Sequence, residues 1–131
     1  MLIHPRLSVV YTSDRGRTLD FLTSVFDFEM EVDVPRGDGG RWVEVRLPGA
    51  QTSVAVALIG ADVLDRMREQ TGRMSQGWFQ CEDLDTTCAR VRARGAGIVV
   101  APQETPWRPG GRWAQVRGWD GNLYGLVEGG R

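Results

Sequence analysis

The hydrophobic residues of this chain alternate between strand-like and helix-like spacing. Short β-rich runs occur at 8–12 and 78–81, and each is followed by an aspartate suited to cap a helix, Asp14 or Asp83. After each aspartate, apolar residues recur at helical spacing. The two predicted stripes are Leu19, Leu22, Val25 and Phe26, and then Leu84, Cys88 and Val91.

Three shorter strands are expected after each of these helices. They are predicted at 28–34, 41–47 and 52–59, and again at 97–101, 112–118 and 123–128. Turn signals at Pro48-Gly49 and Asp120-Gly121-Asn122 separate the last two strands of each set. A short helix at 62–70 is expected between the sets, with Val63, Leu64 and Met67 facing inward.

The two halves repeat one another in sequence. Residues 34–46 read VPRGDGGRWVEVR and residues 105–117 read TPWRPGGRWAQVR, so that the proline, the Gly-Gly-Arg-Trp run, a valine and the final arginine coincide. With a small difference in loop length, Asp14 falls on Asp83. Chance similarity in a chain rich in glycine and arginine is the competing explanation, but a shared run of this length favours duplication.

The repeat predicts an α+β fold made of two tandem βαβββ units that form incomplete barrels around a cleft. We expect one domain over 1–131, with a first unit at about 4–59, a linker helix at about 60–73 and a second unit at about 74–129.

Composition narrows the class of protein. The 131 residues carry a formal net charge of −1 with 41% hydrophobic residues, and no basic stripe points to nucleic acid. No window is apolar enough to span a membrane, and no signal-peptide layout is seen. The two cysteines, Cys81 and Cys88, are expected to be reduced and to be inert thiols in the core. These features predict a cytoplasmic protein.

Tandem βαβββ units resemble the vicinal oxygen chelate superfamily. This group includes glyoxalase I, extradiol dioxygenases, methylmalonyl-CoA epimerase, and the bleomycin- and fosfomycin-resistance proteins. The local marks of the resemblance are Tyr11-Thr12-Ser13-Asp14 before Leu19-Asp20-Phe21-Leu22, the helix end Phe26-Asp27-Phe28-Glu29, and Asp120-Gly121-Asn122 before Leu126-Val127-Glu128. They cover nearly the whole chain and are more specific for the fold than for an activity.

The resemblance implies a divalent metal held by a histidine on the first strand and a carboxylate on the last strand of each unit. The corresponding positions here hold Leu7, Gln76 and Gly125, and the segment from Arg46 to Ala61 supplies no acid or histidine for the fourth. His4, the single histidine, lies an odd number of residues from Leu7 and therefore on the other face of an extended strand, as does Glu128 relative to Gly125. We expect no metal and no cofactor.

The same resemblance places alternate strand residues in the cleft. The predicted ligand-binding residues are Leu7, Val9, Tyr11, Trp42, Glu44, Arg46, Gln76, Trp78, Gln80, Trp113, Gln115 and Arg117. They could stack a flat ligand on indoles and orient it with polar groups. Alternatively, the tryptophans fill the interior or a dimer seam, and Glu44, Arg46 and Arg117 are cross-strand partners. Trp107 and Trp119 fall in loops, either as lids or as interface anchors.

Three hypotheses for function follow. The leading one is a metal-free protein that binds a small molecule and could sequester an aromatic or antibiotic-like ligand, with no catalytic residues. The second is a lyase, isomerase or dioxygenase-like enzyme, either metal-independent or using a cation held by Glu44 and substrate. The third is a structural or regulatory dimer with a vestigial cleft. A homodimer is expected in each case, because every unit leaves a strand edge open.

Overall fold

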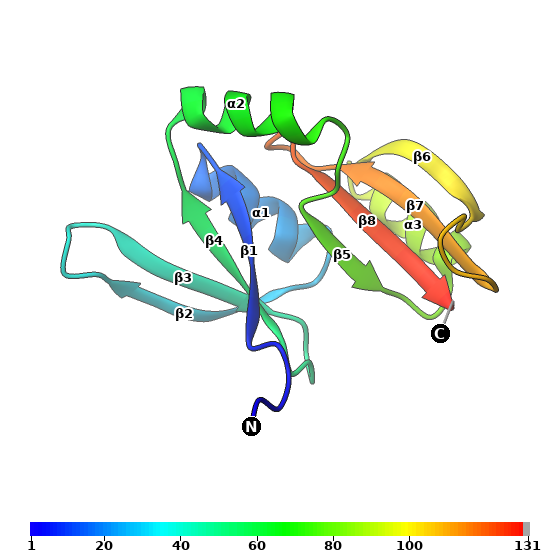
Figure 1. Cartoon of the computed structure of the whole chain (residues 1–131), viewed down its shortest axis with the longest axis horizontal. Helices are drawn as coiled ribbons and strands as arrows, with labels where there is room; N and C mark the ends of the chain where they lie inside the picture. Colours follow the sequence, from blue (N-terminus) through cyan, green and yellow to red (C-terminus); the bar gives the residue numbers. More distant parts are fainter. Residues whose placement is uncertain (130–131) are drawn as a thin grey trace. The chain divides into compact units, whose positions relative to one another are not determined.

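The computed structural model describes residues 1–129 of the chain, which divide into two compact units, Met1–Gln70 and the residues from Thr71 onward. The first unit contains a four-stranded sheet and two helices (Figure 1). Its elements are β1 (Leu7–Thr12), α1 (Arg15–Ser24), β2 (Glu29–Pro35), β3 (Arg41–Arg46), β4 (Ser53–Leu58) and α2 (Ala61–Thr71).

The sheet of the first unit has the strand order β1-β4-β3-β2. Strand β1 runs parallel to β4, and the other neighbours are antiparallel. Val9 pairs with Ala55, and Ala55 pairs in turn with Glu44. Because directly opposed residues point to the same face of a sheet, this row fixes which face each strand residue occupies. The sheet is open, with β1 and β2 as its edges.

Helix α1 begins where the sequence predicts. The Asp14 side chain caps it by accepting a hydrogen bond of 3.1 Å from the Arg17 amide. Leu22 and Val25 are buried as expected. The predicted stripe is wrong in part, since Leu19 and Phe26 are only half-buried. Phe21, which the stripe omitted, is fully buried, with its ring edge-to-face with Phe26 at a centroid distance of 4.9 Å.

Helix α2 also differs from the prediction. Leu64 is buried, but Val63 is 39% exposed and Met67 is half-buried. The expectation that all three face inward is therefore wrong for Val63. With 3.6 residues per turn, adjacent residues are about 100° apart, and a helix that buries one narrow line cannot bury both Val63 and Leu64.

The second unit repeats the first. Its elements are β5 (Gly77–Gln80), α3 (Leu84–Ala93), β6 (Gly97–Glu104), β7 (Gly111–Arg117) and β8 (Leu123–Gly129). The strand order β5-β8-β7-β6 matches that of the first sheet, with β5 parallel to β8. The prediction of two tandem βαβββ units in an α+β fold is confirmed, and neither sheet closes into a barrel.

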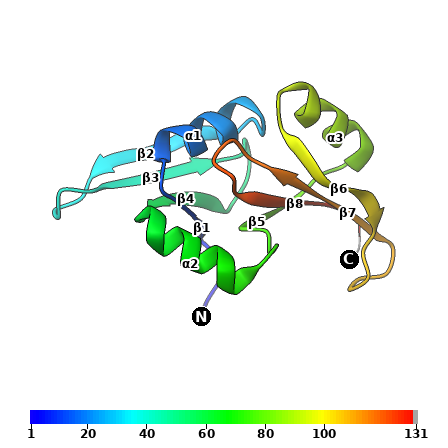
Figure 2. The same cartoon turned by 90° about the horizontal axis from the view of Figure 1, so that it is seen from above.

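Helix α3 packs on one face of its sheet, against β6, β7 and β8 (Figure 2). Asp83 caps it by accepting a hydrogen bond of 3.0 Å from the Thr86 amide, and the predicted stripe of Leu84, Cys88 and Val91 is buried. After the helix, Gly95 adopts a positive φ of 103°, which glycine tolerates best. No helix within residues 1–129 is long and apolar enough to cross a membrane.

Candidate functional site

In the first unit, the predicted separation of strand faces agrees with the pattern of burial. Val10, Val43 and Val45 are buried on the α1 side of the sheet. The alternate residues of β1 and β3, which the sequence predicts to bind ligand, therefore share the opposite face. These residues are Leu7, Val9, Tyr11, Trp42, Glu44 and Arg46. Tyr11 and Trp42 each keep about a third of their surface exposed.

Glu44 is a buried carboxylate in the middle of this face and is 5% exposed. The Trp42 indole Nε1 donates a hydrogen bond of 2.6 Å to Glu44 Oε2. Arg6 Nη1 lies 3.8 Å from Glu44 Oε1, which has no hydrogen-bond partner within the described chain. Arg46 donates to Glu31 Oε1 on the neighbouring strand β2 at 2.8 Å, so it is a cross-strand partner, as the alternative interpretation expects.

In the second unit, the corresponding polar residues are already engaged in structural contacts. Gln115 is 3% exposed, and its amide donates to Arg73 O at 2.7 Å and to Ser75 Oγ at 3.1 Å. Gln76 donates to Asn122 Oδ1 at 2.8 Å. These amides hold the segment before β5 against the sheet. Because both amide groups already donate these hydrogen bonds, the structure does not support the predicted role of Gln76 and Gln115 in ligand binding.

Three tryptophans of the second unit form a cluster. The ring centroids of Trp78 and Trp113 lie 6.0 Å apart. The centroid of Trp107 lies 5.6 Å from that of Trp78 and 5.3 Å from that of Trp113. Trp107 comes from the loop between β6 and β7 and is 55% exposed. We call Trp78, Trp107 and Trp113 the tryptophan cluster. Such tilted and edge-to-face arrangements are the favoured geometries of aromatic pairs.

Sequence reasoning placed Trp42, Trp78 and Trp113 on one stacking surface and left Trp107 undecided. Trp42 belongs to the first unit, and the cluster within the second unit is completed by Trp107. The sequence did carry a signal for Trp107. It corresponds to Arg36 in the first repeat, so the second repeat has a tryptophan in a loop where the first has an arginine. Trp119 has a different role. Its indole Nε1 donates a hydrogen bond of 3.3 Å to Gly95 O, so the ring lies at the end of α3.

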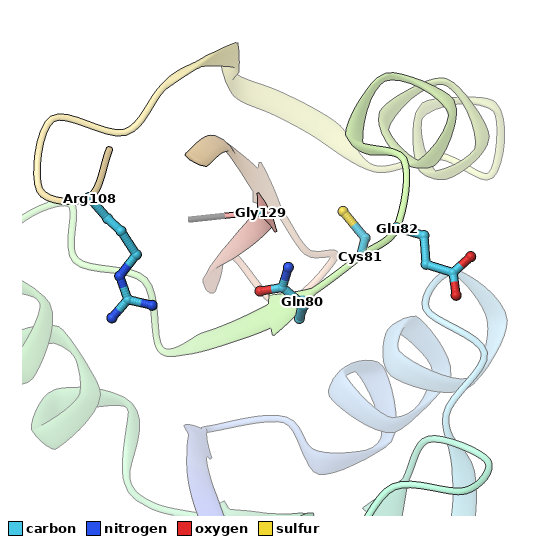
Figure 3. Close-up of a pocket in the computed structure, with 5 residues that line it drawn as sticks. All are labelled: Gln80, Cys81, Glu82, Arg108 and Gly129. Carbon is cyan, nitrogen blue, oxygen red and sulfur yellow. The ribbon is translucent and has the colours of Figure 1, made fainter. Parts of the chain in front are cut away.

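Two adjoining cavities lie beside the cluster. A cavity of about 190 Å³ is lined by Trp78, Gln80, Thr105, Trp107, Arg108, Gly111, Val127, Glu128 and Gly129. A larger one of about 620 Å³ is lined by Gln80, Cys81, Glu82, Arg108 and Gly129 (Figure 3). The larger volume falls in the range of sites for small molecules. Of the residues predicted to bind ligand, Trp78 and Gln80 line these cavities.

Arg117 is the last residue of β7, whereas Arg108 lies in the loop before the other end of that strand. Arg117 is exposed at the C-terminal end of the strand, opposite Leu123 and Gly97. It lines neither cavity, so its predicted role is not supported there. Arg108, which the sequence did not single out, lies in the loop before β7 and lines both.

Both cysteines are free thiols. Burial raises the pKa of both Cys81 and Cys88, and Cys88 lies on the buried face of α3. Cys81 is not a core residue as predicted, because it follows the end of β5, is half-buried and lines the larger cavity. Its Sγ lies 3.4 Å from Val127 O and donates to it. A raised pKa keeps the thiol protonated, which disfavours nucleophilic chemistry.

The positions of the expected metal ligands do not form a metal site. Residues 1–129 contain no group of three or more His, Cys, Asp or Glu residues able to hold an ion. His4 is exposed near the start of the chain. Glu128 faces α3, as its parity predicts, and its Oε1 accepts a hydrogen bond of 2.9 Å from the Leu84 amide. At Gly125, an added Cβ would lie 2.2 Å from Trp78 Cε3, so the indole already fills that space.

Comparisons with known proteins agree with this fold. Residues 4–125 match the family model of the Glyoxalase/Bleomycin resistance protein/Dioxygenase superfamily. The uncharacterized protein YetH of Bacillus subtilis (strain 168) is 27% identical over 120 residues, which are 91% of this chain and 92% of YetH. TnmS3, an antibiotic binding protein from Streptomyces sp. CB03234, has a TM-score of 0.76 at 29% identity, covering 97% of this chain and 96% of TnmS3.

A second solved structure, UcmS2, supports the fold alone, with a TM-score of 0.80 at 22% identity over 97% of this chain and 98% of UcmS2. The family match covers most of the chain, and the duplicated βαβββ units have the architecture that the sequence predicted for that family. The chain therefore belongs to the Glyoxalase/Bleomycin resistance protein/Dioxygenase superfamily.

Proposed function

We propose that this protein binds a small planar aromatic molecule without metal and sequesters it. The observation that carries the proposal is the tryptophan cluster beside the two cavities, because indole faces bind flat rings without reactive groups. The likeness to TnmS3, an antibiotic binding protein, supports an antibiotic-like ligand. Sequestration requires affinity alone, and no catalytic residue or cofactor is part of the proposal.

The positions that hold metal ligands in related enzymes support a binding role over metal-dependent catalysis. Leu7 and Gln76 lack the imidazole that the resemblance implies, and the Trp78 ring covers Gly125. The exchange of a metal ligand for an indole surface replaces a site that polarises substrates with one that stacks on them. We also propose that the protein is cytoplasmic and acts as a homodimer.

One observation favours a second candidate, a metal-independent enzyme. Glu44 is buried, and its Oε1 has no hydrogen-bond partner in residues 1–129. A buried carboxylate oxygen that accepts no hydrogen bond, with Arg6 Nη1 at 3.8 Å, could take a proton from a substrate. The two candidates differ in a simple readout, because only the enzyme converts its ligand, and Glu44→Gln would abolish that conversion while leaving binding in place.

The proposed binding is tested by titrating tryptophan fluorescence with a panel of planar aromatic antibiotics. Trp107→Ala is the most informative variant, since its side chain lies in an exposed loop and is not part of a strand. Loss of one stacking wall should weaken a ligand by about tenfold, because a stacked ring is worth on the order of 1 kcal/mol beyond its buried area.

Thermal melts on the same proteins separate a binding role from a structural one. Trp107→Ala should melt close to the parent, and Trp119→Ala is the matched control because Trp119 is a loop tryptophan outside the cluster. The proposal fails if the parent binds nothing in the panel, or if Trp107→Ala and Trp119→Ala bind equally well. In the first case, the vestigial dimer becomes the better account.

A further inference from the structure

We propose that the ligand of this site carries an anionic group next to its aromatic ring, and that the Arg108 guanidinium binds this group. The inference rests on the proposed binding function and specifies the class of ligand. It follows from the way in which the two cavities of the second unit join, and from the charges that line them.

The two cavities share Gln80, Arg108 and Gly129, so they meet at these residues. On one side of this boundary lie the tryptophans Trp78 and Trp107, and on the other lie Cys81 and Glu82. A ligand with a ring against the indoles would therefore place its next substituent beside Arg108 and Gln80. In Figure 3, the Arg108 side chain extends from its loop on one side of the cavity, and the Gln80 carboxamide lies between Arg108 and Cys81.

The backbone at Arg108 is held in place. Its carbonyl oxygen accepts hydrogen bonds from Thr105 Oγ1 and from the Gly111 amide, the latter at 3.4 Å. The guanidinium, in contrast, makes no ion pair or hydrogen bond with any residue from 1 to 129. Other arginines of this chain form ion pairs, for example Arg112 with Asp85 and Arg41 with Asp33.

The acids near the cavities do not neutralise Arg108. Glu128 lines the smaller cavity, but its Oε1 accepts from the Leu84 amide and its Oε2 lies 3.8 Å from Arg112 Nη1. Glu82 lines only the larger cavity, and Figure 3 shows its carboxylate pointing away from Arg108. Among residues 1–129, no acid pairs with Arg108, which lies at the end of an aromatic site. A guanidinium in such a place favours a planar anion such as a carboxylate, which it can bind with two parallel hydrogen bonds.

The test uses two probes of the same shape, 2-naphthoate and its neutral amide 2-naphthamide, titrated into the parent protein and followed by tryptophan fluorescence. We expect naphthoate to bind about tenfold more tightly than naphthamide. Arg108→Gln should remove this preference, weakening naphthoate by about tenfold and leaving naphthamide within about twofold, because charge-assisted hydrogen bonds are the stronger kind. Added salt should weaken naphthoate binding alone.

The control variant is Arg90→Gln, which removes a positive charge from the exposed surface of α3, away from the cavity lining. It should leave both probes unaffected. Equal affinity for the two probes, with no response to Arg108→Gln but weaker binding in Trp107→Ala, would overturn this inference and retain the proposed function. Binding of neither probe, nor of any aromatic in the panel, would overturn both. A thermal melt of Arg108→Gln at the parent's temperature confirms that the change is not one of folding.

Discussion

The indole of Trp78 lies directly on Gly125, its cross-strand neighbour, so that a Cβ at position 125 would come within 2.2 Å of Trp78 Cε3. Trp78 is on β5 and Gly125 on β8, at the position where the family resemblance implies a metal-binding carboxylate. The two residues therefore act as a pair. The indole requires a glycine beneath it, and a glycine there leaves no ligand for a metal.

Gly125→Ala should destabilise the protein by about 1–3 kcal/mol, which is typical of overpacking at a well-packed contact. The measurement is the free energy of unfolding in urea. Trp78→Ala in the same chain should remove most of this penalty, since it opens the space that the new methyl group needs. The strand residue Gly97 is the matched control, because its added Cβ would meet nothing closer than 3.8 Å, and Gly97→Ala should cost little. Additive effects of Gly125→Ala and Trp78→Ala would contradict the steric explanation.

The purified protein should contain no stoichiometric transition metal. Restoring an acid by Gly125→Glu should not create a site either, because the Trp78 ring occupies the space and Leu7 and Gln76 supply no imidazole. Elemental analysis of both proteins tests this expectation. About one Ni, Fe, Mn or Zn per chain in the parent protein would show that the positions inferred from the family pattern are wrong.

Trp42→Phe should destabilise the first unit by about 1–3 kcal/mol. The change removes the indole N–H, the donor to Glu44 Oε2, and leaves a buried carboxylate whose nearest cation is Arg6 at 3.8 Å. The free energy of unfolding in urea measures the loss. Glu44→Gln in the Trp42→Phe background should recover part of it, because a neutral amide costs less to bury than a charge. If Trp42→Phe unfolds like the parent, the hydrogen bond contributes nothing to stability.

The sequence predicted the fold well because its signals are local and occur twice. Asp14 and Asp83 cap their helices as expected, and the strand order is the same in both units. Alternate residues of a strand were predicted to face opposite sides of the sheet. Val10 agrees with this prediction, because it is buried and both of its neighbours in the strand are less buried. These features depend on alternation and capping, which neighbouring residues determine.

The site was predicted less completely, since parity gives the face of a side chain but not its partners. Gln115 was assigned to the correct face, yet its amide is taken up by Arg73 and Ser75. Trp107 and Arg108 lie in a loop, where no periodicity indicates direction. Cys81 follows the last residue of β5, so the strand pattern that assigned it to the core no longer applied. Each error concerns a residue whose position depends on tertiary contacts.

A homodimer is expected in solution. Each sheet has open edges, β1 and β2 in the first unit and β5 and β6 in the second. Strand β2 is exposed along most of its length, including Met30 and Val34, so its edge and side chains could be covered by another copy. Sedimentation at tens of micromolar should give the mass of two chains. A monomer under those conditions would contradict the expectation.

Alkylation of Cys81 should depend on pH in a way that reports its burial, and ligand should block it. Because burial raises the pKa of this thiol, its reaction with iodoacetamide should keep rising with pH beyond the point at which an exposed cysteine levels off. The same shift means that the neutral thiol is favoured in the folded protein. Its contribution to stability is complete below the unfolded pKa and is lost as the pH rises through the folded one.

Cys88→Ala leaves Cys81 as the single thiol, so that mass spectrometry of the labelled protein gives its rate of alkylation directly. Saturating 2-naphthoate should slow this rate severalfold, since Cys81 lines the cavity that also contains Arg108. Unchanged alkylation at a ligand concentration that quenches the tryptophans would place the bound probe outside this cavity.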